Sequence, residues 1–499
     1  MRIVIVGSGM AAVRLVEGLV ARASTSSTSE RLQITVLGEE PHAPYNRILL
    51  SAVLEGTHRA DAITLRSPQW YADHGVELRL GTRVADIDRV EQEVVLAGAE
   101  RVPYDHLVLA TGAIPSLPPI RGLIGPDGML HERVHAFRSL EDCTRLLELL
   151  ATGKVRRAVV VGGGLLGLQV ARALAIRGVE TEIVEGGEHL LRSHVDEQAG
   201  RILKRSLTAL GTSVYTGARA IKLVDNPADD DGEWSVGLKL DNGFTLDTDL
   251  VVLTAGGRPS TSVARRAGLA VARGIVVDET LTSVFDERIH AIGDCAETVL
   301  ADGQGRTSGF VPPAWDQANI LAARLTGADT TYDGHKLVAR LRATGLEVAV
   351  LGDPADTVGA TGEVAEQDGC EVVQVSNPVN GSLRKLVMRD GVIVAATLIG
   401  DLSRIGLITQ AFDRGTVLGP QEPGQLLMGV RADESPGGLS GQLPDDAEVC
   451  ACAGVSAGRI RGCSSLADVK ERTRATTGCG GCVSAVTALL QGAPAPVTT

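Results

Sequence analysis

The sequence predicts an α/β protein in which two Rossmann-like domains are interleaved along the chain, followed by a small α+β domain and a small helical module. Three observations support this fold class. A β-branched strand, a glycine-rich turn and a helix occur in that order from Arg2, and the same order recurs from Ala158. Residues 335 to 400 alternate in hydropathy, with turns at Asn380-Gly381 and Asp390-Gly391. Five of the eight cysteines lie in the last 50 residues.

The composition disfavours several classes of protein. The chain has 499 residues, with 48 Lys and Arg against 61 Asp and Glu, which gives a formal charge of −13. At about 150 residues per domain, this length predicts about three domains. The acidic balance argues against a nucleic-acid-binding surface, which is normally basic. The uncharged run from Ala158 to Ala171 is shorter than the about 20 residues that cross a bilayer, so we expect no membrane insertion.

The N-terminus has the outline of a secretory signal, because an apolar stretch from Ile3 to Val13 precedes an Ala-x-Ala triplet that begins at Ala21. Arg14 and Glu17 interrupt the apolar character, and regularly spaced glycines lie inside the stretch. We therefore expect no signal peptide. The cysteines are too sparse for a disulfide scaffold, and their clustering predicts a reduced, cytoplasmic protein with one local metal site.

The first glycine loop follows the strand Arg2 to Val6 and opens a helix, which is the context that a dinucleotide fingerprint requires. Its glycines let the backbone approach a pyrophosphate, and the helix N-terminus offers unpaired N–H groups. A carboxylate after the second strand, Gln33 to Leu37, is placed to accept a hydrogen bond from a ribose hydroxyl. A glycine turn in an unrelated α/β protein remains the alternative. The predicted residues are Gly7, Gly9, Met10, Ala11, Ala12 and Glu39.

Two further strands end in short motifs: Asp105 to Gly112 reads DHLVLATG, and Ile289 to Asp294 reads IHAIGD. With these motifs in order, the chain resembles the FAD-dependent pyridine-nucleotide oxidoreductases. The resemblance implies that Thr111 and Gly112 pack beside FAD and that Asp294 hydrogen-bonds its ribityl or phosphate region. It also implies an FAD-binding domain at 1–120 and 245–328, and an NAD(P)H-binding domain at 121–244.

The second glycine loop carries the stricter form of the fingerprint, and the resemblance assigns it to NAD(P)H. Glu185 ends the following strand and is placed to bind ribose hydroxyls, whereas a 2′-phosphate there would face like charge. No arginine occurs among residues 186–188, so we expect NADH rather than NADPH. A loop kept for packing alone is the alternative. The predicted residues are Gly162, Gly164, Leu165, Leu166, Gly167 and Glu185, and Gly257 in the return from this domain.

Thiol chemistry beside the flavin is not expected. Disulfide reductases of this fold carry a cysteine pair on the helix after the first acidic residue, but residues 44–51 contain no cysteine. We interpret Cys143, Cys295 and Cys370 as packing residues. We also predict no catalytic acid, base or nucleophile in the chain.

The last module contains two close cysteine pairs, Cys450 with Cys452 and Cys479 with Cys482, whose four thiolates suit zinc or an iron–sulfur cluster. Zinc ribbons favour two intervening residues in both pairs, so the single residue between the first two cysteines favours iron–sulfur. Residues 473–482 resemble the [2Fe–2S] module of bacterioferritin-associated ferredoxin. Zinc and disulfides remain alternatives, and we interpret Cys463 as a bystander. We predict a linker at 429–446 and the [2Fe–2S] module at 447–492.

The domain order, with the small α+β domain at 329–428, resembles the N-terminal half of the NAD(P)H nitrite reductase large subunit. The stretch Tyr45 to Ser51, which contains Arg47 at a predicted FAD contact, matches the local pattern of that family. The resemblance implies electron transfer from NADH through FAD and the cluster to a partner, as in the electron-transfer subunit of assimilatory nitrate reductase. The expected partner is a molybdopterin nitrate reductase. Alternatives are ferredoxin, rubredoxin or a separate nitrite reductase, and, in another class, an iron-store docking module.

Overall fold

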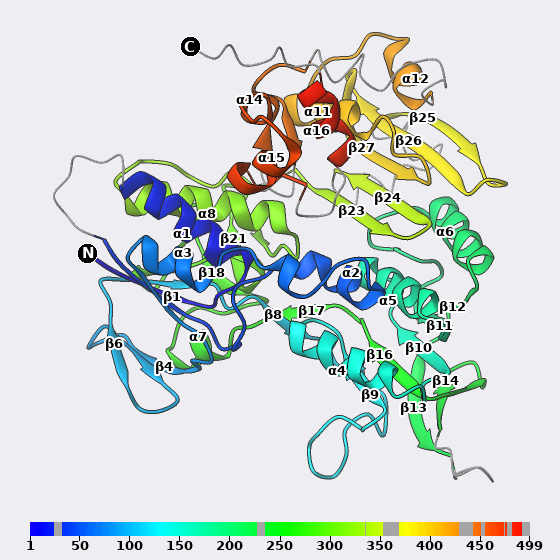
Figure 1. The fold of residues 1–499 in the computed structure, drawn as a ribbon, viewed down its shortest axis with the longest axis horizontal. Helices are drawn as coiled ribbons and strands as arrows, with labels where there is room; N and C mark the ends of the chain where they lie inside the picture. Colours follow the sequence, from blue (N-terminus) through cyan, green and yellow to red (C-terminus); the bar gives the residue numbers. More distant parts are fainter. Residues whose placement is uncertain are drawn as a thin grey trace. The chain divides into compact units, whose positions relative to one another are not determined.

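The computed structural model describes residues 1–23, 32–226, 235–334, 336–352, 369–428, 443–450, 455–473, 475–476 and 482–491. The chain forms two compact units, each made of segments that are distant in sequence (Figure 1). The first comprises Met1–Arg47, Ala60–Ser116 and Gly257–His335, and the second comprises Ile48–Arg59, Leu117–Gly256 and Lys336–Thr499. This organisation confirms the predicted interleaved α/β architecture.

The first unit is built on one large sheet. Its strands are β1 (Arg2–Val6), β2 (Gln33–Leu37), β3 (Val76–Arg79), β7 (His106–Leu109), β18 (Ile275–Val277), β19 (Thr282–Ser283), β20 (Asp286–Ala291), β21 (Ala296–Val299) and β22 (Gly305–Arg306). They are ordered β22-β21-β18-β19-β20-β7-β1-β2-β3. The adjacent strands from β20 to β3 are parallel, so their carboxyl ends meet at one edge, where ligands of doubly wound folds bind.

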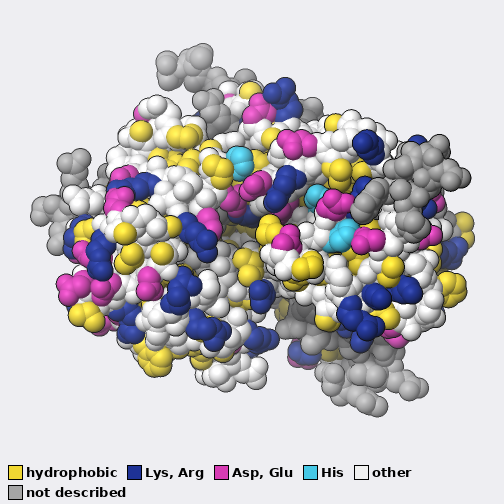
Figure 2. All heavy atoms as spheres, turned by 90° about the horizontal axis from the view of Figure 1, so that it is seen from below, with side chains coloured by type: hydrophobic (Ala, Val, Ile, Leu, Met, Phe, Trp, Pro, Cys, Tyr) yellow, Lys and Arg dark blue, Asp and Glu magenta, His cyan; other side chains and the backbone are white. Residues whose placement is uncertain are grey.

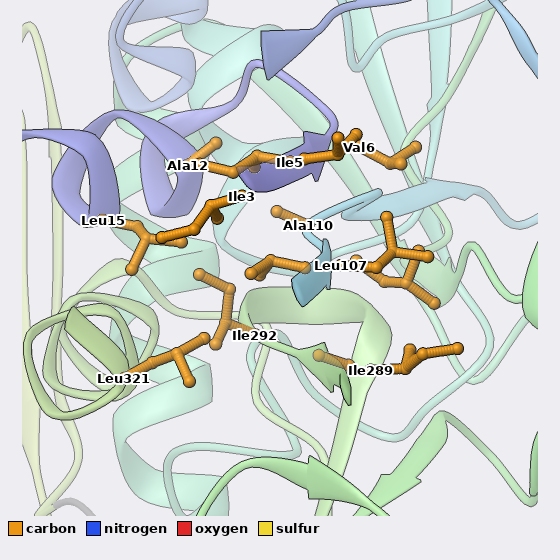
Figure 3. Packing of buried hydrophobic residues seen from close by; sticks show 14 of the residues in the cluster. Ile3, Ile5, Val6, Ala12, Leu15, Leu107, Ala110, Ile289, Ile292 and Leu321 are labelled. Carbon is orange, nitrogen blue, oxygen red and sulfur yellow. The ribbon is translucent and has the colours of Figure 1, made fainter. Parts of the chain in front are cut away.

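Helices and smaller sheets complete the first unit. The helices are α1 (Met10–Ala23), α3 (Pro68–Asp73), α7 (Ser262–Arg266) and α8 (Val311–Leu325), with 3₁₀ turns η2 (Asp61–Ile63) and η3 (Gly293–Cys295). The 3₁₀ turn η1 (Arg47–Leu49) starts at the last residue of the segment Met1–Arg47, and its other two residues belong to the second unit. The remaining strands are β4 (Val84–Asp88), β5 (Glu93–Leu96) and β6 (Arg101–Pro103) in one sheet, and β8 (Ala113–Pro115) and β17 (Gly257–Pro259) in another. Side chains of β1, β7 and β20 pack with those of α1 and α8 in the core, as the labelled residues of Figure 3 show.

The second unit begins with a five-stranded parallel sheet. Its elements are α2 (Leu50–Glu55), β9 (Val134–Ala136), α4 (Leu140–Ala151), β10 (Arg157–Val161), α5 (Leu165–Ile176), β11 (Glu180–Glu185), α6 (Glu197–Ala209), β12 (Thr212–Thr216), β13 (Ala220–Asp225), β14 (Val236–Leu240), β15 (Thr245–Thr248) and β16 (Leu250–Leu253). The parallel strands are ordered β12-β11-β10-β16-β9, while β13, β14 and β15 form an antiparallel sheet.

The predicted return to the first domain at residue 245 is too early. Strand β16 pairs in parallel with β10, with Ala158 opposite Leu250, so it belongs to the sheet of the second unit. The chain re-enters the first unit at Gly257. The physical reason is that a buried apolar strand, here fully buried at Leu250 to Val252, completes the hydrogen bonding of β10 on its free side. The predicted range 1–120 also contains residues 48–59, which cluster with the second unit.

The α+β region consists of β23 (Val338–Ala343), β24 (Leu346–Leu351), β25 (Glu371–Asn377), β26 (Ser382–Arg389), β27 (Val392–Ile399), α11 (Ile405–Arg414) and α12 (Glu422–Leu427). Its antiparallel sheet is ordered β23-β24-β27-β26-β25, and α11 packs on one face. Asp390 and Gly391 both have positive φ, which is typical of the two-residue hairpin turn that the sequence predicts. Most of the predicted linker, residues 429–442, lies outside the described residues.

The C-terminal module contains β28 (Glu448–Cys450), β29 (Val455–Ser456), α14 (Ala457–Arg461), α15 (Leu466–Thr473) and α16 (Val483–Gln491). It has an apolar core of its own, which includes Val455, Ile460, Val469 and Leu489. The small helical character predicted for this module is confirmed.

Candidate functional site

The first glycine loop joins β1 to α1 at the carboxyl edge of the first sheet. Gly7 has φ +108° and its N–H donates to the carbonyl of Leu37 at 2.8 Å. A Cβ atom on Gly7 would lie 2.2 Å from the carbonyl oxygen of Ala110, so no other residue fits there. In contrast, a Cβ on Gly9 would have no protein atom within 4 Å. The first glycine is therefore required by the fold, and the second leaves open space beside the start of α1, as a pyrophosphate site requires.

The turn that follows β20 also lies against the first glycine loop. Gly293, in η3 after β20, has φ +75°, and a Cβ on it would lie 3.1 Å from Cβ of Ala11. Its N–H donates to Oε1 of Gln317 in α8 at 2.7 Å, which ties the turn to that helix. Asp294 follows Gly293, so the structure brings the predicted Asp294 and the loop of Ala11 and Ala12 to the same edge.

The Thr111-Gly112 turn is fixed by a hydrogen bond to the returning chain. The Thr111 hydroxyl donates to the carbonyl of Ser260 at 2.7 Å, and Gly112 has φ +65°. Strand β8 then pairs with β17, in which Gly257 lies opposite Pro115. Gly257, predicted for the NAD site, is thus part of the first unit, and its contact with the nicotinamide coenzyme stays a prediction.

Arg47 lies in a charged cluster that the sequence reasoning did not find. Its guanidinium bonds the carboxylate of Glu40, which also accepts the Tyr45 hydroxyl at 2.8 Å. The guanidinium carbon is 5.0 Å from the centre of the Tyr45 ring. Burial opposes the charge on Arg47, but Tyr45, Glu40 and Asp294 outweigh it and raise its pKa. Arg47 is therefore a permanent cation near Asp294, suited to an anionic part of a dinucleotide.

The second glycine loop joins β10 to α5. Gly162 has φ +122°, and a Cβ on it would lie 2.6 Å from the carbonyl oxygen of Thr254. A Cβ on Gly167 would lie 1.9 Å from the carbonyl oxygen of Gly162, so α5 packs directly on the loop. Gly164 precedes Leu165 and Leu166 at the helix start and has nothing within 4 Å of its Cβ position. All three glycines have the geometry expected of an intact fingerprint.

Glu185 is held at the end of β11 by two backbone donors. Its carboxylate accepts the N–H groups of Gly163 and Gly187, each at 2.7 Å, and its side chain is 14% exposed. The carboxylate therefore faces the glycine loop at the carboxyl edge of the second sheet. This is the position from which an acidic residue binds ribose hydroxyls.

The two strand–loop–helix units differ in the residue that ends their second strand, so Glu39 of the first is not the counterpart of Glu185 in the second. The N–H of Gly162 donates to Val184 as that of Gly7 donates to Leu37, so Glu185 corresponds to Gly38 and not to Glu39. A Cβ on Gly38 would lie 2.5 Å from the Ser8 hydroxyl, so a side chain at this position would have to displace Ser8, and the first copy has a glycine where the second has its carboxylate.

Glu39 itself is 74% exposed and lies 3.6 Å from Nε of Arg83. Its predicted ribose contact is not supported by this correspondence and stays a prediction.

The cysteine module brings two predicted ligands into one core. Cys450 ends β28 and Cys482 precedes α16, and both are buried in the same apolar cluster. A thiolate at Cys482 would be favoured by the N-terminus of α16. Cys452 and Cys479 lie outside the described residues. Among the residues that are described, no three potential metal ligands gather at one point.

The other cysteines have the environment of packing residues. The Cys463 thiol donates to the carbonyl of Arg459, and burial raises its pKa. Burial raises the pKa of Cys143 to about 11, and that of Cys295 also lies above the ordinary value. Cys143, Cys295 and Cys370 are all buried, which agrees with their predicted role.

Two observations bear on possible partners, one on the helices and one on the surface. Within the described parts of the chain, no helix is both long and apolar enough to span a bilayer. On the face shown in Figure 2, basic and acidic side chains are both widely distributed, with hydrophobic side chains between them.

Comparison with known proteins identifies both parts of the chain. Residues 1–318 match the pyridine nucleotide-disulphide oxidoreductase family, and residues 448–492 match the BFD-like [2Fe-2S] binding domain. A nitrite reductase [NAD(P)H] of Bacillus subtilis is 33% identical over 98% of this chain and 57% of its own length. The assimilatory nitrate reductase electron transfer subunit of the same species is 28% identical over 98% of this chain and 59% of its own length. The chain thus spans little more than half of these relatives.

A solved structure extends the comparison to the fold. The ferredoxin reductase for the CYP199A2 system from Rhodopseudomonas palustris has a TM-score of 0.71 at 26% identity, covering 86% of this chain and 97% of that protein. The cofactors implied by the two families are FAD, NAD(P)H and a [2Fe–2S] cluster, and the glycine loops and buried cysteines described above fit them. The chain therefore belongs to the pyridine nucleotide-disulphide oxidoreductase family and carries a BFD-like [2Fe-2S] domain near its C-terminal end.

Proposed function

We propose that the protein is an NADH-dependent oxidoreductase that passes electrons through FAD and a [2Fe–2S] cluster to a separate redox protein. The observation that carries the proposal is that both glycine loops keep an open second glycine, Gly9 and Gly164, although they lie in different units. A docking module for an iron store would need neither loop. The BFD-like domain adds a carrier of single electrons.

The side chains have distinct roles in this proposal. The N-termini of α1 and α5 bind pyrophosphate groups through backbone N–H groups. Arg47 and Asp294 hold the first dinucleotide, and Glu185 orients the ribose of the second. When bound, FAD supplies the exchange between the electron pair of NADH and the single electrons that an iron–sulfur cluster carries. We assign no catalytic acid, base or nucleophile.

Four cysteines are proposed as cluster ligands: Cys450, Cys452, Cys479 and Cys482. The proposed partner is the molybdopterin catalytic subunit of an assimilatory nitrate reductase, because the relative with that electron-transfer role matches nearly the whole of this chain. We place the reaction in the cytoplasm, where thiols stay reduced.

A ferredoxin-type acceptor is the second candidate. It is favoured by the similarity to a ferredoxin reductase over 97% of that protein. Genes adjacent to this one distinguish the two partners, because a molybdopterin enzyme encoded nearby supports the nitrate route.

The decisive experiment is an anaerobic titration of the purified protein with NADH. Bleaching of the flavin absorbance should be followed by an EPR signal of a reduced [2Fe–2S] cluster, and nitrate reductase added afterwards together with nitrate should reoxidise both. Cys482→Ser should abolish the EPR signal and electron delivery while flavin bleaching persists, whereas Cys463→Ser should change neither. A colourless protein, or a cysteine module that holds only zinc, would contradict the proposal.

A further inference from the structure

The small α+β sheet packs on two helices of the second dinucleotide fold. Arg172 of α5 is buried, and its guanidinium donates to the carbonyl of Thr344, between β23 and β24, at 3.1 Å and to that of Leu210, the C-cap of α6, at 3.0 Å. A Cβ on Gly381, just before β26, would lie 2.7 Å from the hydroxyl oxygen of Ser206 in α6. The α+β region is therefore in direct contact with α6 and with α5, the helix that begins at the second glycine loop.

One contact in this packing is a buried ion pair. Nζ of Lys385 in β26 lies 2.9 Å from Oδ2 of Asp196, and the two side chains are 3% and 7% exposed. Asp196 is also the N-cap of α6, because its Oδ1 accepts the N–H of Ala199 at 2.8 Å. Capping alone needs no charge, since serine and asparagine cap helices as well as aspartate does. The added cation therefore fixes β26 against the start of α6, because separating the two would leave each charge buried and unpaired.

The segment before Asp196 is fastened to the second glycine loop. The N–H of Val195 donates to the carbonyl of Leu191 at 3.0 Å, and the N–H of Leu191 donates to the carbonyl of Gly163 at 3.0 Å. Leu191 and Val195 are both buried, and Leu191 adopts φ +54°, an unfavourable conformation for a leucine. This turn therefore transmits the position of Asp196 to the loop.

Gly163 is held through both of its backbone polar groups. Its N–H donates to Oε2 of Glu185 at 2.7 Å, and its carbonyl accepts the bond from Leu191. The peptide that joins Gly163 to Gly164 is planar, so fixing its carbonyl also fixes the direction of the Gly164 N–H. Gly164 is the N-cap of α5 and has open space at its Cβ position. A movement of Leu191 would therefore turn an N–H group at the proposed pyrophosphate site.

We propose that Lys385 is a positioning residue for the second dinucleotide site. Its ion pair with Asp196 holds the turn that begins at Leu191, and through that turn the loop at Gly163, in the arrangement that binds the pyrophosphate of the coenzyme. The inference rests on the proposed function of this site. It gives a part in coenzyme binding to residues 319–447, which lie outside the ranges of both matched families.

The test measures coenzyme binding without electron transfer. ADP-ribose, which carries the pyrophosphate and both riboses, is titrated calorimetrically into the full chain loaded with FAD and cluster. Lys385→Met should weaken ADP-ribose binding by about fivefold or more, a usual magnitude for coupling through a packed network. The ratio of flavin to protein should stay at the wild-type value, because the first site lies in the other unit. Lys385→Arg should recover part of the affinity, since it keeps a cation beside Asp196.

A double variant separates positioning from stability. Lys385→Met leaves the Asp196 carboxylate buried without that cation, whereas adding Asp196→Asn removes the charge and keeps a residue that caps α6. Most of the stability lost in Lys385→Met should therefore return in urea denaturation. The double variant should still bind ADP-ribose about fivefold or more weakly than the wild type, because β26 is no longer tied to α6. Recovery of affinity together with stability would overturn the inference.

Arg384→Met is the matched control. Arg384 precedes Lys385 on β26, so the two side chains point to opposite faces of the sheet. The Arg384 side chain is 14% exposed and lies 3.2 Å from the carboxylate of Asp401, a pair that does not include α6. Its replacement makes the same charge change on the same strand, and it should alter ADP-ribose affinity by less than about twofold. Equal weakening by both variants would refute the role of Lys385.

Reduction of the flavin by NADH separates this inference from the proposed function. An interaction that is equal in the ground state and the transition state changes the half-saturating concentration and leaves the limiting rate unchanged. In stopped-flow experiments, Lys385→Met should therefore raise the NADH concentration for half-maximal reduction by about fivefold or more, with a limiting rate within about twofold of the wild type. A wild-type concentration dependence in this variant would refute the role of Lys385 alone. Failure of NADH to bleach the wild-type flavin would refute the proposed function itself.

Discussion

Replacing Gly167 with alanine should disable the second dinucleotide site and leave the first one loaded. The new Cβ would lie 1.9 Å from the carbonyl oxygen of Gly162 and 2.8 Å from the hydroxyl oxygen of Thr254. Ordinary contacts begin near 3.4 Å, so α5 would have to move away from the loop by about 1.5 Å. Overpacking of this kind costs about 1–3 kcal/mol of the free energy of unfolding.

The same movement should weaken coenzyme binding, because it carries the N–H groups at the start of α5 away from the pyrophosphate. A displacement of about 1 Å can cost about a hundredfold in rate, so we expect at least a tenfold slower reduction of FAD by NADH. Stopped-flow absorbance measures that rate, and the ratio of bound flavin to protein measures the first site. Flavin content should remain at the wild-type value, because the first loop lies in the other unit.

Gly164→Ala is the control that separates packing from ligand contact. Gly164 has φ −81°, which alanine also adopts, and no protein atom lies within 4 Å of its Cβ position. The change should lower the free energy of unfolding by less than about 1 kcal/mol, the usual range for a helix N-cap. The new methyl group would instead occupy the open space beside Gly164, where we propose that the coenzyme binds. Urea denaturation followed by circular dichroism should therefore distinguish the two variants. Equal stability losses, or NADH reduction at the wild-type rate in Gly167→Ala, would refute this account.

Three other predictions follow from buried or charged contacts. Lys385→Met should lower the free energy of unfolding by about 3 kcal/mol in urea denaturation, because it leaves Asp196, whose carboxylate lies 2.9 Å from Nζ of Lys385, buried without that partner. Burial lowers the pKa of His290 to about 3. As the pH falls, this imidazole is therefore protonated in the unfolded chain before it is protonated in the folded one. Stability should fall by about 1.4 kcal/mol per pH unit below about pH 6, and a pH series of His290→Asn should show a shallower slope. Glu185→Ala should weaken NADH binding in a titration more than it changes flavin content, and an unchanged NADH affinity would exclude the ribose contact.

The parts of the fold that the sequence predicts best are those in which backbone geometry restricts the residue type. Gly7 and Gly162 are identifiable because any side chain there would collide with a neighbouring strand. The strands that follow the loops are identifiable because buried parallel strands are continuous apolar runs.

The domain boundary near residue 245 was harder to predict, because β16 resembles any other buried strand. Its membership depends on which strand offers it a free edge, and that is a property of the assembled sheet.

The candidate site was less predictable than the fold for a related reason. Glu39 follows its strand at a plausible distance, but the hydrogen bond from Gly7 fixes the register one residue earlier. No arginine directly follows Glu185 in the sequence, although Arg192 lies with its Nε 3.5 Å from Oε1 of Glu185. A segment that turns at Leu191 returns the arginine to the same point. Contacts of this kind depend on the path of a loop, which spacing along the chain does not specify.

The differences between the two glycine loops indicate that they are not interchangeable. The backbone N–H of Val13 donates a hydrogen bond to the carbonyl of Gly9, just as the N–H of Leu168 donates to the carbonyl of Gly164. Ala12, the residue before Val13, therefore occupies the position that Gly167 has in the second loop. Two features therefore belong to the second loop alone. One is the close packing of Gly167 of α5 on Gly162 of the loop, and the other is the carboxylate of Glu185 at the end of the second strand. The first copy has an alanine, a glycine and the nearby Arg47 instead. Neither fingerprint by itself would assign its ligand, and the assignment depends on the side chains that each unit gathers around its loop.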